Sequence, residues 1–160
     1  LREAIPAITA SGDAELAALT SRAHRQLHGS APRIAVAGVN PHAGEGGRFG
    51  IEEEAIRRGV ELAAASGMQI SGPHAPANVF LAPRNGQYDV AMAMYHDQGL
   101  IAVKTLEFER SVNVTIGLPY LRASVGHGTA FDIAGKNIAD PRPMRYAIEW
   151  TARHASRWQR

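Results

Sequence analysis

Short apolar runs alternate with helix-patterned stretches along this 160-residue chain, and this alternation limits the fold more than any other feature. The run RIAVAGV (33–39) is rich in β-branched residues and predicts a buried strand. The run YDVAMAMYH (88–96) predicts a second buried strand. Helical spacing occurs between and after these runs. Strands that alternate with helices predict an α/β domain with a largely parallel sheet.

Three longer segments have helical spacing and recognisable end signals. In the first, residues 11–29, Ser11 and Asp13 are candidate N-caps. The second, residues 51–67, has a Glu-rich first turn that suits the helix dipole and a terminal Gly that suits a C-cap. The third, residues 141–158, has Pro near its start. Shorter segments are predicted as a brief strand (MQISG), a Pro-rich connection with one helical turn (GPHAPANVFLAPRNG), short helices (QGLIAVKTL and GTAFDIAG) and strand-like runs (SVNVTIGLP and YLRASVG).

Composition excludes several classes of protein. The chain has no Cys, which leaves no disulfide framework and no thiolate zinc site and fits a cytoplasmic location. The net charge is only +2 and the basic residues are scattered, so we expect no nucleic-acid partner. No apolar run approaches the ~20 residues that cross a bilayer, so we expect no membrane partner. The chain starts without Met in what resembles the middle of an element, so we expect a portion of a longer polypeptide.

Two of the seven histidines stand where α/β proteins bind ligands. His42 and His96 each follow the carboxyl end of a predicted strand. Neutral imidazole is a good ligand for Zn²⁺ or a similar ion. The alternative is that each ring only bonds the backbone of its own turn, and spacing alone leaves both interpretations open. We interpret His24, His28 and His154 as surface residues. His74, in a Pro-rich connection, stays ambiguous.

Two further patterns carry weaker signals. Lys104, Asn113 and Arg122 stand at the ends of successive elements, and such a trio would bind a phosphate or carboxylate. The alternative is three independent surface or turn residues. The Gly-rich loop NPHAGEGGRFG (40–50) contains G-x-G, but Phe49 occupies the last glycine position of a dinucleotide fingerprint. We interpret its glycines as allowing the backbone to pass close to a ligand.

Several motifs together carry a family resemblance. VNPHAGEGGRFGIEE, AMYHDQGL and VNVTIGLPYLRASVGHGTAFDIAG resemble the C-terminal half of the 4-hydroxythreonine-4-phosphate dehydrogenase family of pyridoxal phosphate biosynthesis. GHGTAFDIAGKNIADP is similar to the adenosine-binding loop of isocitrate and isopropylmalate dehydrogenases. The resemblance implies their three-layer α/β/α fold, with residues 1–160 as one α/β segment of a longer two-domain enzyme whose N-terminal part is missing here.

The resemblance also implies an activity. It implies an oxidoreductase that oxidises and decarboxylates 4-phosphooxy-L-threonine with NAD and a divalent metal such as Zn, Mg or Co. The partner would be this small phosphorylated hydroxy acid, and the enzyme would be a cytoplasmic homodimer.

Residue roles follow from the same resemblance. His42 and His96 match two of the family's three metal-binding histidines, and the third would precede Leu1. Lys104, Asn113 and Arg122 match the substrate-binding residues. Asp97 is the candidate for proton transfer or for support of His96, and Lys104 is a second catalytic candidate. The residues that match the cofactor loop are His127, Gly128, Thr129, Ala130, Asp132 and Asp140, the last standing where an Asn is usual.

Three departures limit the assignment of the substrate. Asn78 stands near the position of an expected acid, Gly126 replaces an Asp, and EFERS (107–111) replaces a Gly-rich segment. The alternatives are a related dehydrogenase for a four-carbon sugar-acid phosphate or for an aromatic cis-dihydrodiol. A non-enzymatic, metal-binding remnant is a further alternative.

Overall fold

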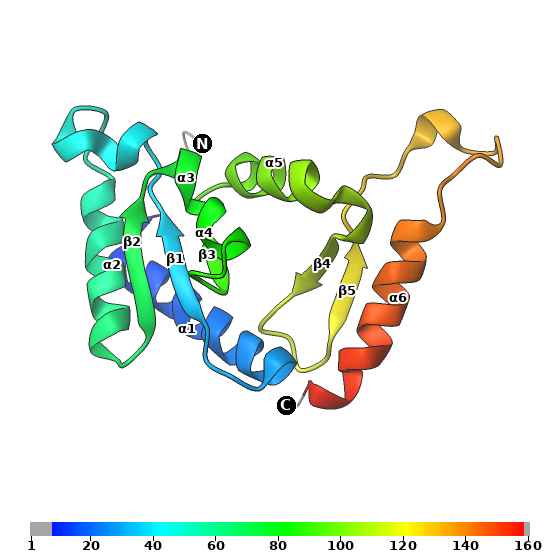
Figure 1. The fold of residues 1–160 in the computed structure, drawn as a ribbon, viewed down its shortest axis with the longest axis horizontal. Coiled ribbons are helices and arrows are strands. Elements are labelled where there is room, and N and C mark those ends of the chain that lie inside the picture. The colour runs from blue at the N-terminus through cyan, green and yellow to red at the C-terminus, as the bar shows by residue number, and fades with distance from the viewer. Residues whose placement is uncertain (1–7, 159–160) are drawn as a thin grey trace. The chain divides into compact units, whose positions relative to one another are not determined.

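The computed structural model describes residues 8–158, and its contacts divide the chain into two compact units, Leu1–Leu100 and Ile101–Arg160 (Figure 1). The elements of the first unit are α1 (Ala10–His28), β1 (Arg33–Ala37), the 3-10 turn η2 (Pro41–Gly47), α2 (Glu53–Ala65), β2 (Gln69–His74), α3 (Pro76–Val79), α4 (Leu81–Arg84) and β3 (Val90–Met92). Helix α5 (His96–Glu107) contains the boundary between the units. The second unit contains η3 (Phe108–Arg110), β4 (Val112–Thr115), β5 (Arg122–Val125), η4 (Phe131–Ile133), α6 (Arg142–His154) and η5 (Ala155–Arg157).

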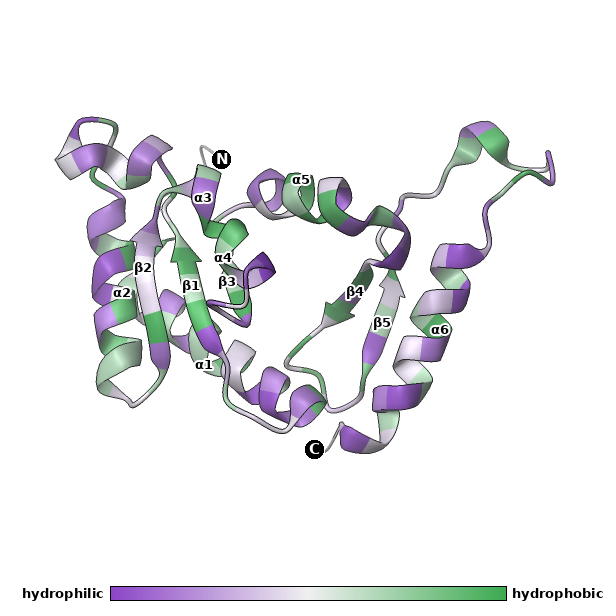
Figure 2. Ribbon diagram, in the orientation of Figure 1, coloured by the Kyte–Doolittle hydropathy of each residue, from purple (hydrophilic) through white to green (hydrophobic). Residues whose placement is uncertain are grey.

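The first unit is a three-layer α/β/α arrangement around a parallel sheet with strand order β2-β1-β3. The central strand β1 is apolar on both faces, as its colour shows (Figure 2). Its residues Ile34 and Val36 pack against α1 and α2, whereas Ala35 and Ala37 pack against Val79 of α3. A strand that is buried on both faces is typical of a parallel sheet. The prediction of an α/β fold is therefore confirmed.

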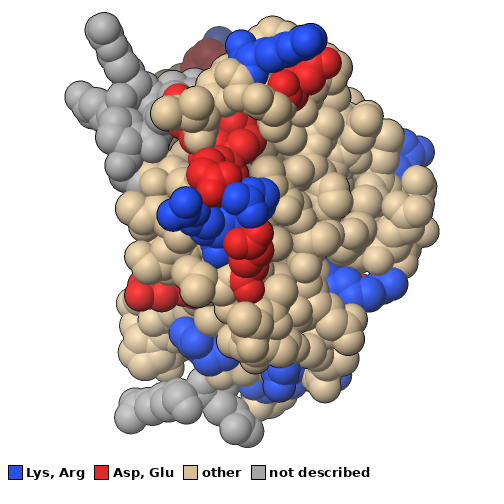
Figure 3. All heavy atoms as spheres, turned by 90° about the vertical axis from the view of Figure 1, so that its left-hand side faces the viewer, with Lys and Arg blue, Asp and Glu red and all other residues tan. Residues whose placement is uncertain are grey.

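Local chemistry explains the two long helices of this unit. Helix α1 begins after Thr9, whose side-chain oxygen accepts a hydrogen bond from the backbone N–H of Gly12 at 3.1 Å. The predicted caps Ser11 and Asp13 were therefore wrong, because both lie inside the helix. The outer face of α2 carries Glu54, Arg57, Arg58 and Glu61 in i,i+3 and i,i+4 ion pairs. Figure 3 shows acidic and basic side chains interleaved on this side of the molecule.

The strand predicted over residues 88–96 is shorter in the structure. Strand β3 covers only Val90–Met92, and His96 already belongs to α5. The backbone N–H of Met94 donates to Oε1 of Gln98 at 2.7 Å, so it serves the first turn of α5 instead of a strand ladder. The buried Gln98 also donates through Nε2 to the carbonyl of Gly38, at 2.8 Å.

The second unit is built on an antiparallel hairpin of β4 and β5. In its register Asn113 pairs with Ser124 and Thr115 with Arg122, so these four polar residues share one face. The valines and alanine between them occupy the opposite face. Helix α6 packs on both strands and buries Pro143 and Ala147. Because Asn113 and Arg122 are exposed, α6 covers the apolar face.

The prediction of a short helix over GTAFDIAG was wrong, because this segment forms only the 3-10 turn η4. Ala130 and Gly135 have φ of 50° and 75°, so left-handed residues lie on both sides of η4 and a longer right-handed helix cannot form. Within residues 8–158, no helix is both long and apolar enough to cross a membrane.

Candidate functional site

The sheet of the first unit brings the two predicted metal ligands to one edge. Strands β1 and β3 are parallel neighbours, with Ile34 paired to Val90 and Val36 to Met92. Their carboxyl ends therefore lie at the same edge. His42 follows β1 and His96 follows β3, as their sequence positions predicted. In open α/β sheets this edge is where ligands bind.

The backbone around His42 is left-handed. Five consecutive residues, from His42 to Gly46, have φ between 42° and 78°. Three of them, His42, Ala43 and Glu45, are not glycine, and a left-handed conformation costs such residues roughly 1–2 kcal/mol each. The side chain of His42 is exposed, and its ring lies 6.3 Å from that of Phe49, centroid to centroid. The Gly-rich loop is therefore a strained turn that presents an imidazole.

His96 and Asp97 form a hydrogen-bonded pair at the start of α5. The His96 Nδ1 lies 2.8 Å from Asp97 Oδ1, and both side chains are exposed. This bond fixes which ring nitrogen faces the carboxylate and leaves Nε2 directed elsewhere. A carboxylate that orients a histidine in this way is common beside metal ions. The contact supports an orienting role for Asp97.

The two imidazoles fit a metal ion by donor type but form an incomplete set. Among residues 8–158, no three His, Asp or Glu side chains gather closely enough to hold an ion. His74, which the sequence left ambiguous, ends the neighbouring strand β2, but its Nε2 lies 2.8 Å from Ser71 Oγ. Ser71 in turn lies 2.7 Å from the Tyr88 hydroxyl. His74 is thus engaged in a polar network of its own.

The second unit places two of the three predicted anion-binding residues together. Asn113 on β4 and Arg122 on β5 share the polar face of the hairpin. A guanidinium N–H of Arg122 donates to Thr115 Oγ1 at 2.8 Å, which orients the cation across this face. Lys104 is exposed on α5. The pairing supports the anion-site interpretation for Asn113 and Arg122, and Thr115 is a partner that sequence spacing did not reveal.

A cavity of about 920 Å³ lies beside the predicted cofactor loop, within the second unit. Its wall includes five of the six predicted cofactor residues, all except Asp132, which lies on η4. Phe108, Glu109 and Pro143 contribute to the same wall. The predicted residues that line it are His127, Gly128, Thr129, Ala130 and Asp140.

An ion-pair network borders this cavity. Arg142 donates through Nε to both carboxylate oxygens of Asp140, at 3.0 and 2.9 Å, and through its terminal nitrogen to Glu109 at 2.9 Å. Hydrogen bonds from the Arg142 side chain, and then from its backbone N–H, lower the pKa of Asp140. Asp140 carries a negative charge that an Asn would lack, and the guanidinium of Arg142 balances this charge.

One departure from the family pattern also has a structural partner. A Cβ at Gly126 would overlap the hydroxyl of Ser111. Ser111 ends the EFERS segment, and its hydroxyl donates to the carbonyl of Phe108 at 2.9 Å. The departures at 111 and 126 therefore accommodate each other: the hydroxyl fills the space that a larger residue at 126 would need.

The comparisons with known proteins agree with these motifs. Residues 1–151 match the family model described as pyridoxal phosphate biosynthetic protein PdxA. The chain belongs to the PdxA family. One PdxA-family relative, 4-hydroxythreonine-4-phosphate dehydrogenase of Roseobacter denitrificans, is 55% identical over 134 residues, which are 83% of this chain and 41% of the relative. D-threonate 4-phosphate dehydrogenase of Pectobacterium atrosepticum is 53% identical over 119 residues, 74% of this chain and 36% of the relative.

A solved PdxA-family structure matches the fold as well. The 4-hydroxythreonine-4-phosphate dehydrogenase of Klebsiella pneumoniae has a TM-score of 0.86 and 42% identity, over 97% of this chain and 48% of that one. The chain thus spans less than half the length of the relatives it matches. These three PdxA-family relatives are named dehydrogenases.

Proposed function

We propose that the full-length protein is an NAD-dependent, divalent-metal-assisted dehydrogenase that oxidises and decarboxylates 4-phosphooxy-L-threonine in pyridoxal phosphate biosynthesis. We further propose that it works as a cytoplasmic homodimer. The observation that carries the dehydrogenase proposal is the 920 Å³ cavity lined by five residues of the loop that resembles an adenosine site. Membership of the PdxA family and the relatives' names support the pathway.

The second unit would bind the dinucleotide, which accepts a hydride when bound. A mostly apolar wall with a few polar groups suits a flat heteroaromatic ring. Phe108, Ile133 and Pro143 supply apolar wall, while His127 and Asp140 supply polar groups at its border. The loop residues Gly128 and Ala130 have no bulky side chains, so backbone can approach the ligand.

The hairpin would bind the phosphorylated end of the substrate. Arg122 offers a guanidinium fork and Asn113 an amide donor on one polar face. These are the groups that recognise phosphate oxygens. Lys104 would add an ammonium group that neutralises charge and can deliver a proton to the product.

His42 and His96 would hold a divalent ion, which polarises the substrate's hydroxyl and carboxylate oxygens when bound. Asp97 keeps the His96 ring oriented through its 2.8 Å bond. Its exposed carboxylate would also be the candidate for receiving the hydroxyl proton. Oxidation at the hydroxyl carbon leaves a β-keto acid, whose carboxyl group can leave as CO₂.

A second substrate, D-threonate 4-phosphate, is favoured by the 53% identity to the Pectobacterium atrosepticum enzyme. It is also a phosphorylated four-carbon hydroxy acid, so the same phosphate-binding residues would serve. Asn78, near the position of an acid in the family pattern, lines a small cavity of about 370 Å³ together with His74. An aromatic cis-dihydrodiol has no phosphate for Arg122 to bind and ranks third.

A substrate panel on the full-length protein tests this proposal. Each of the three substrates is supplied with NAD⁺ or NADP⁺ and with Zn²⁺, Mg²⁺ or Co²⁺, and formation of reduced nicotinamide is followed. His96→Ala should abolish metal-dependent turnover, whereas His28→Ala, on the exposed surface of α1, should retain it. Near-normal turnover in His96→Ala would contradict the metal assignment. Absence of turnover with every substrate would favour the non-enzymatic remnant.

A further inference from the structure

We propose that Glu53, together with Asn40, is a positioning residue for His42. The pair holds the turn Pro41–Gly47 in its left-handed conformation and so fixes where the imidazole is presented. This inference rests on the metal-binding role proposed for His42. It adds a role for two residues to which the proposed function assigns none.

The turn needs an external restraint. Three non-glycine residues with positive φ lie within five positions, at His42, Ala43 and Glu45. Such strain persists only where surrounding structure fixes the backbone. Backbone hydrogen bonds in this segment run from Ala43 N–H to Asn40 O, at 3.1 Å, from Phe49 N–H to Gly44 O, at 3.2 Å, and from Arg48 N–H to Gly44 O. These bonds are local to residues 40–49, and contacts from elsewhere in the fold add to the restraint on the backbone.

The carboxylate of Glu53 supplies that restraint. Its Oε1 accepts from the backbone N–H of Asn40 at 2.7 Å, and its Oε2 accepts from Asn40 Nδ2 at 2.8 Å. Asn40 directly precedes the turn, and Glu53 is buried, with 9% of its surface exposed. Glu53 also starts helix α2, whose N-terminal dipole stabilises a carboxylate. The N-terminus of α2, the buried Glu53 side chain and the start of the turn are thus joined in one place.

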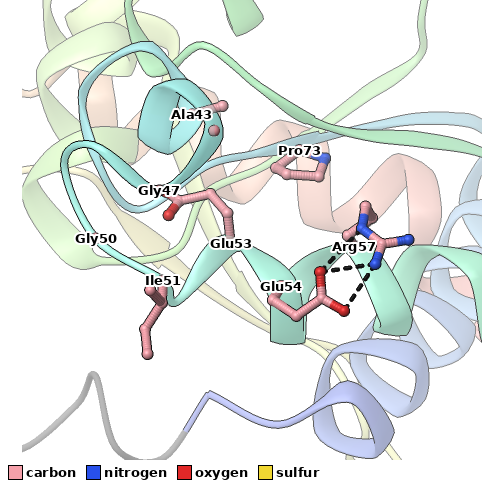
Figure 4. A pocket seen from close by; sticks show the side chains of 9 residues that line it. Ala43, Gly47, Gly50, Ile51, Glu53, Glu54, Arg57 and Pro73 are labelled. Carbon is pink, nitrogen blue, oxygen red and sulfur yellow. Dashed lines mark hydrogen bonds and ion pairs between the residues drawn. The ribbon is translucent and has the colours of Figure 1, made fainter.

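Two glycines fit closely around this carboxylate. A Cβ on Gly44, inside the turn, would lie 2.8 Å from Glu53 Oε2. A Cβ on Gly38, just after β1, would lie 3.3 Å from Oε1 and 3.0 Å from the Cα of Ala43. In Figure 4 the Glu53 side chain rises from the start of α2 toward the loop, whereas Glu54 joins Arg57. The carboxylate is therefore bordered by backbone that precedes the turn and by backbone within it.

The test measures metal binding to the full-length protein, with Zn²⁺ alone and a competing chelator. Glu53→Ala should weaken Zn²⁺ binding at least about tenfold, the loss usual when support of a ligating histidine is removed. The Zn²⁺ affinity of Glu53→Gln should lie between those of the wild type and Glu53→Ala, because the Gln amide oxygen can still accept from the Asn40 N–H. Glu54→Gln is the matched control: it makes the same charge change one residue away, on an exposed side chain, and should bind as the wild type does.

Two additional measurements separate positioning from folding. The visible spectrum of the Co²⁺-loaded protein should change in Glu53→Ala, because it reports ligand geometry, and Gly38→Ala should change it in the same direction without altering any ionisable group. Unfolding temperatures of the metal-free variants identify conditions in which each is folded. If Glu53→Ala does not fold, the Zn²⁺ affinities and Co²⁺ spectra of Glu53→Gln and Gly38→Ala test the positioning role instead.

Unchanged Zn²⁺ affinity and an unchanged Co²⁺ spectrum in folded Glu53 variants, with only a lower unfolding temperature, would overturn the inference. His42→Ala distinguishes this result from failure of the proposed function. If His42→Ala binds Zn²⁺ as the wild type does, His42 is no ligand and the metal proposal itself fails. If His42→Ala loses affinity and Glu53→Ala does not, only the positioning role fails.

Discussion

At the scale of residues, backbone strain gathers where ligands are expected. In residues 8–158 the non-glycine positions with positive φ are His42, Ala43, Glu45, Ala130 and Asn137. The first three lie in the turn that carries a predicted metal ligand, and the other two border the cavity of the cofactor loop. Strained residues cluster at functional sites because only a well-packed frame maintains them. This distribution is independent of any family motif and selects the same two segments.

Strain at Ala43 gives a stability prediction. Ala43→Gly should raise the free energy of unfolding by about 0.5–1 kcal/mol, because glycine adopts positive φ without a Cβ clash and this gain exceeds the extra freedom of the unfolded chain. Chemical denaturation of the two proteins measures the difference.

Ala64→Gly is the matched control, since it makes the same substitution at an exposed position within α2. It should lower stability by about 0.5–1 kcal/mol. Equal losses in both variants would show that the turn carries no strain at Ala43.

The sequence predicted the positions of the candidate ligand residues but not the residues that hydrogen-bond around them. His42 and His96 were located by their positions after strands, and the structure brings them to one sheet edge. Asn40, Glu53 and Thr115 were missed, because their roles depend on hydrogen bonds across 7 to 13 positions that no spacing rule encodes. The roles predicted for the ligand residues themselves stay predictions.

At the scale of elements, one ion pair joins the starts of two neighbouring strands. Asp89, before β3, accepts from the side chain of Arg33 at 3.0 and 2.9 Å and from its backbone N–H at 2.8 Å. The backbone N–H of Asp89 donates to the carbonyl of Arg33 at 2.9 Å. Side-chain and then backbone hydrogen bonds from Arg33 hold the pKa of Asp89 well below its usual range. The pair therefore favours the register of β1 with β3.

This pair predicts a pH-dependent stability. A carboxyl whose pKa is lower in the folded state stabilises the fold above its ordinary pKa of 3.8 and loses that contribution as the pH falls. Asp89→Asn should therefore lower the unfolding temperature at neutral pH, and the difference from the wild type should shrink below about pH 4. Thermal unfolding across pH measures it.

Glu15→Gln, at an exposed position of α1, is the control and should show no such convergence. A difference between Asp89→Asn and the wild type that stays constant from neutral to acid pH would contradict the role of the Asp89 charge.

Element types were largely predictable, and their ends were not. Periodicity located α1, α2 and α6, because each buries one side against a sheet or hairpin. The apolar run through Met94 suggested a longer β3, but the side chain of Gln98 takes the Met94 N–H and starts a helix. The Met94 N–H could bond either to a neighbouring strand or to this side chain, and the pattern of apolar residues does not predict which bond forms.

At the scale of the whole molecule, the chain forms two units, each with its own sheet. The sequence predicted the α/β class, but it gave no linker signal at the boundary because α5 runs through it without Pro or a Gly-rich break. The two tryptophans, Trp150 and Trp158, both lie in the second unit. Trp150 stacks on His154, and Trp158 donates to the carbonyl of Leu118 at 3.2 Å.

This placement predicts non-coincident unfolding of the 160-residue chain. Tryptophan fluorescence should report only the second unit, whereas far-ultraviolet circular dichroism should report the helices of both. Because separate units need not unfold together, the two denaturation curves should have different midpoints. Superimposable curves would show that the units unfold as one cooperative body.

The two-sided hairpin has an evolutionary consequence. Side chains that would meet a substrate and side chains that hold α6 alternate along β4 and β5, so mutation can sample one set while the other stays constant. Selection for a new substrate then acts on positions such as 113 and 122 without penalty from selection for folding.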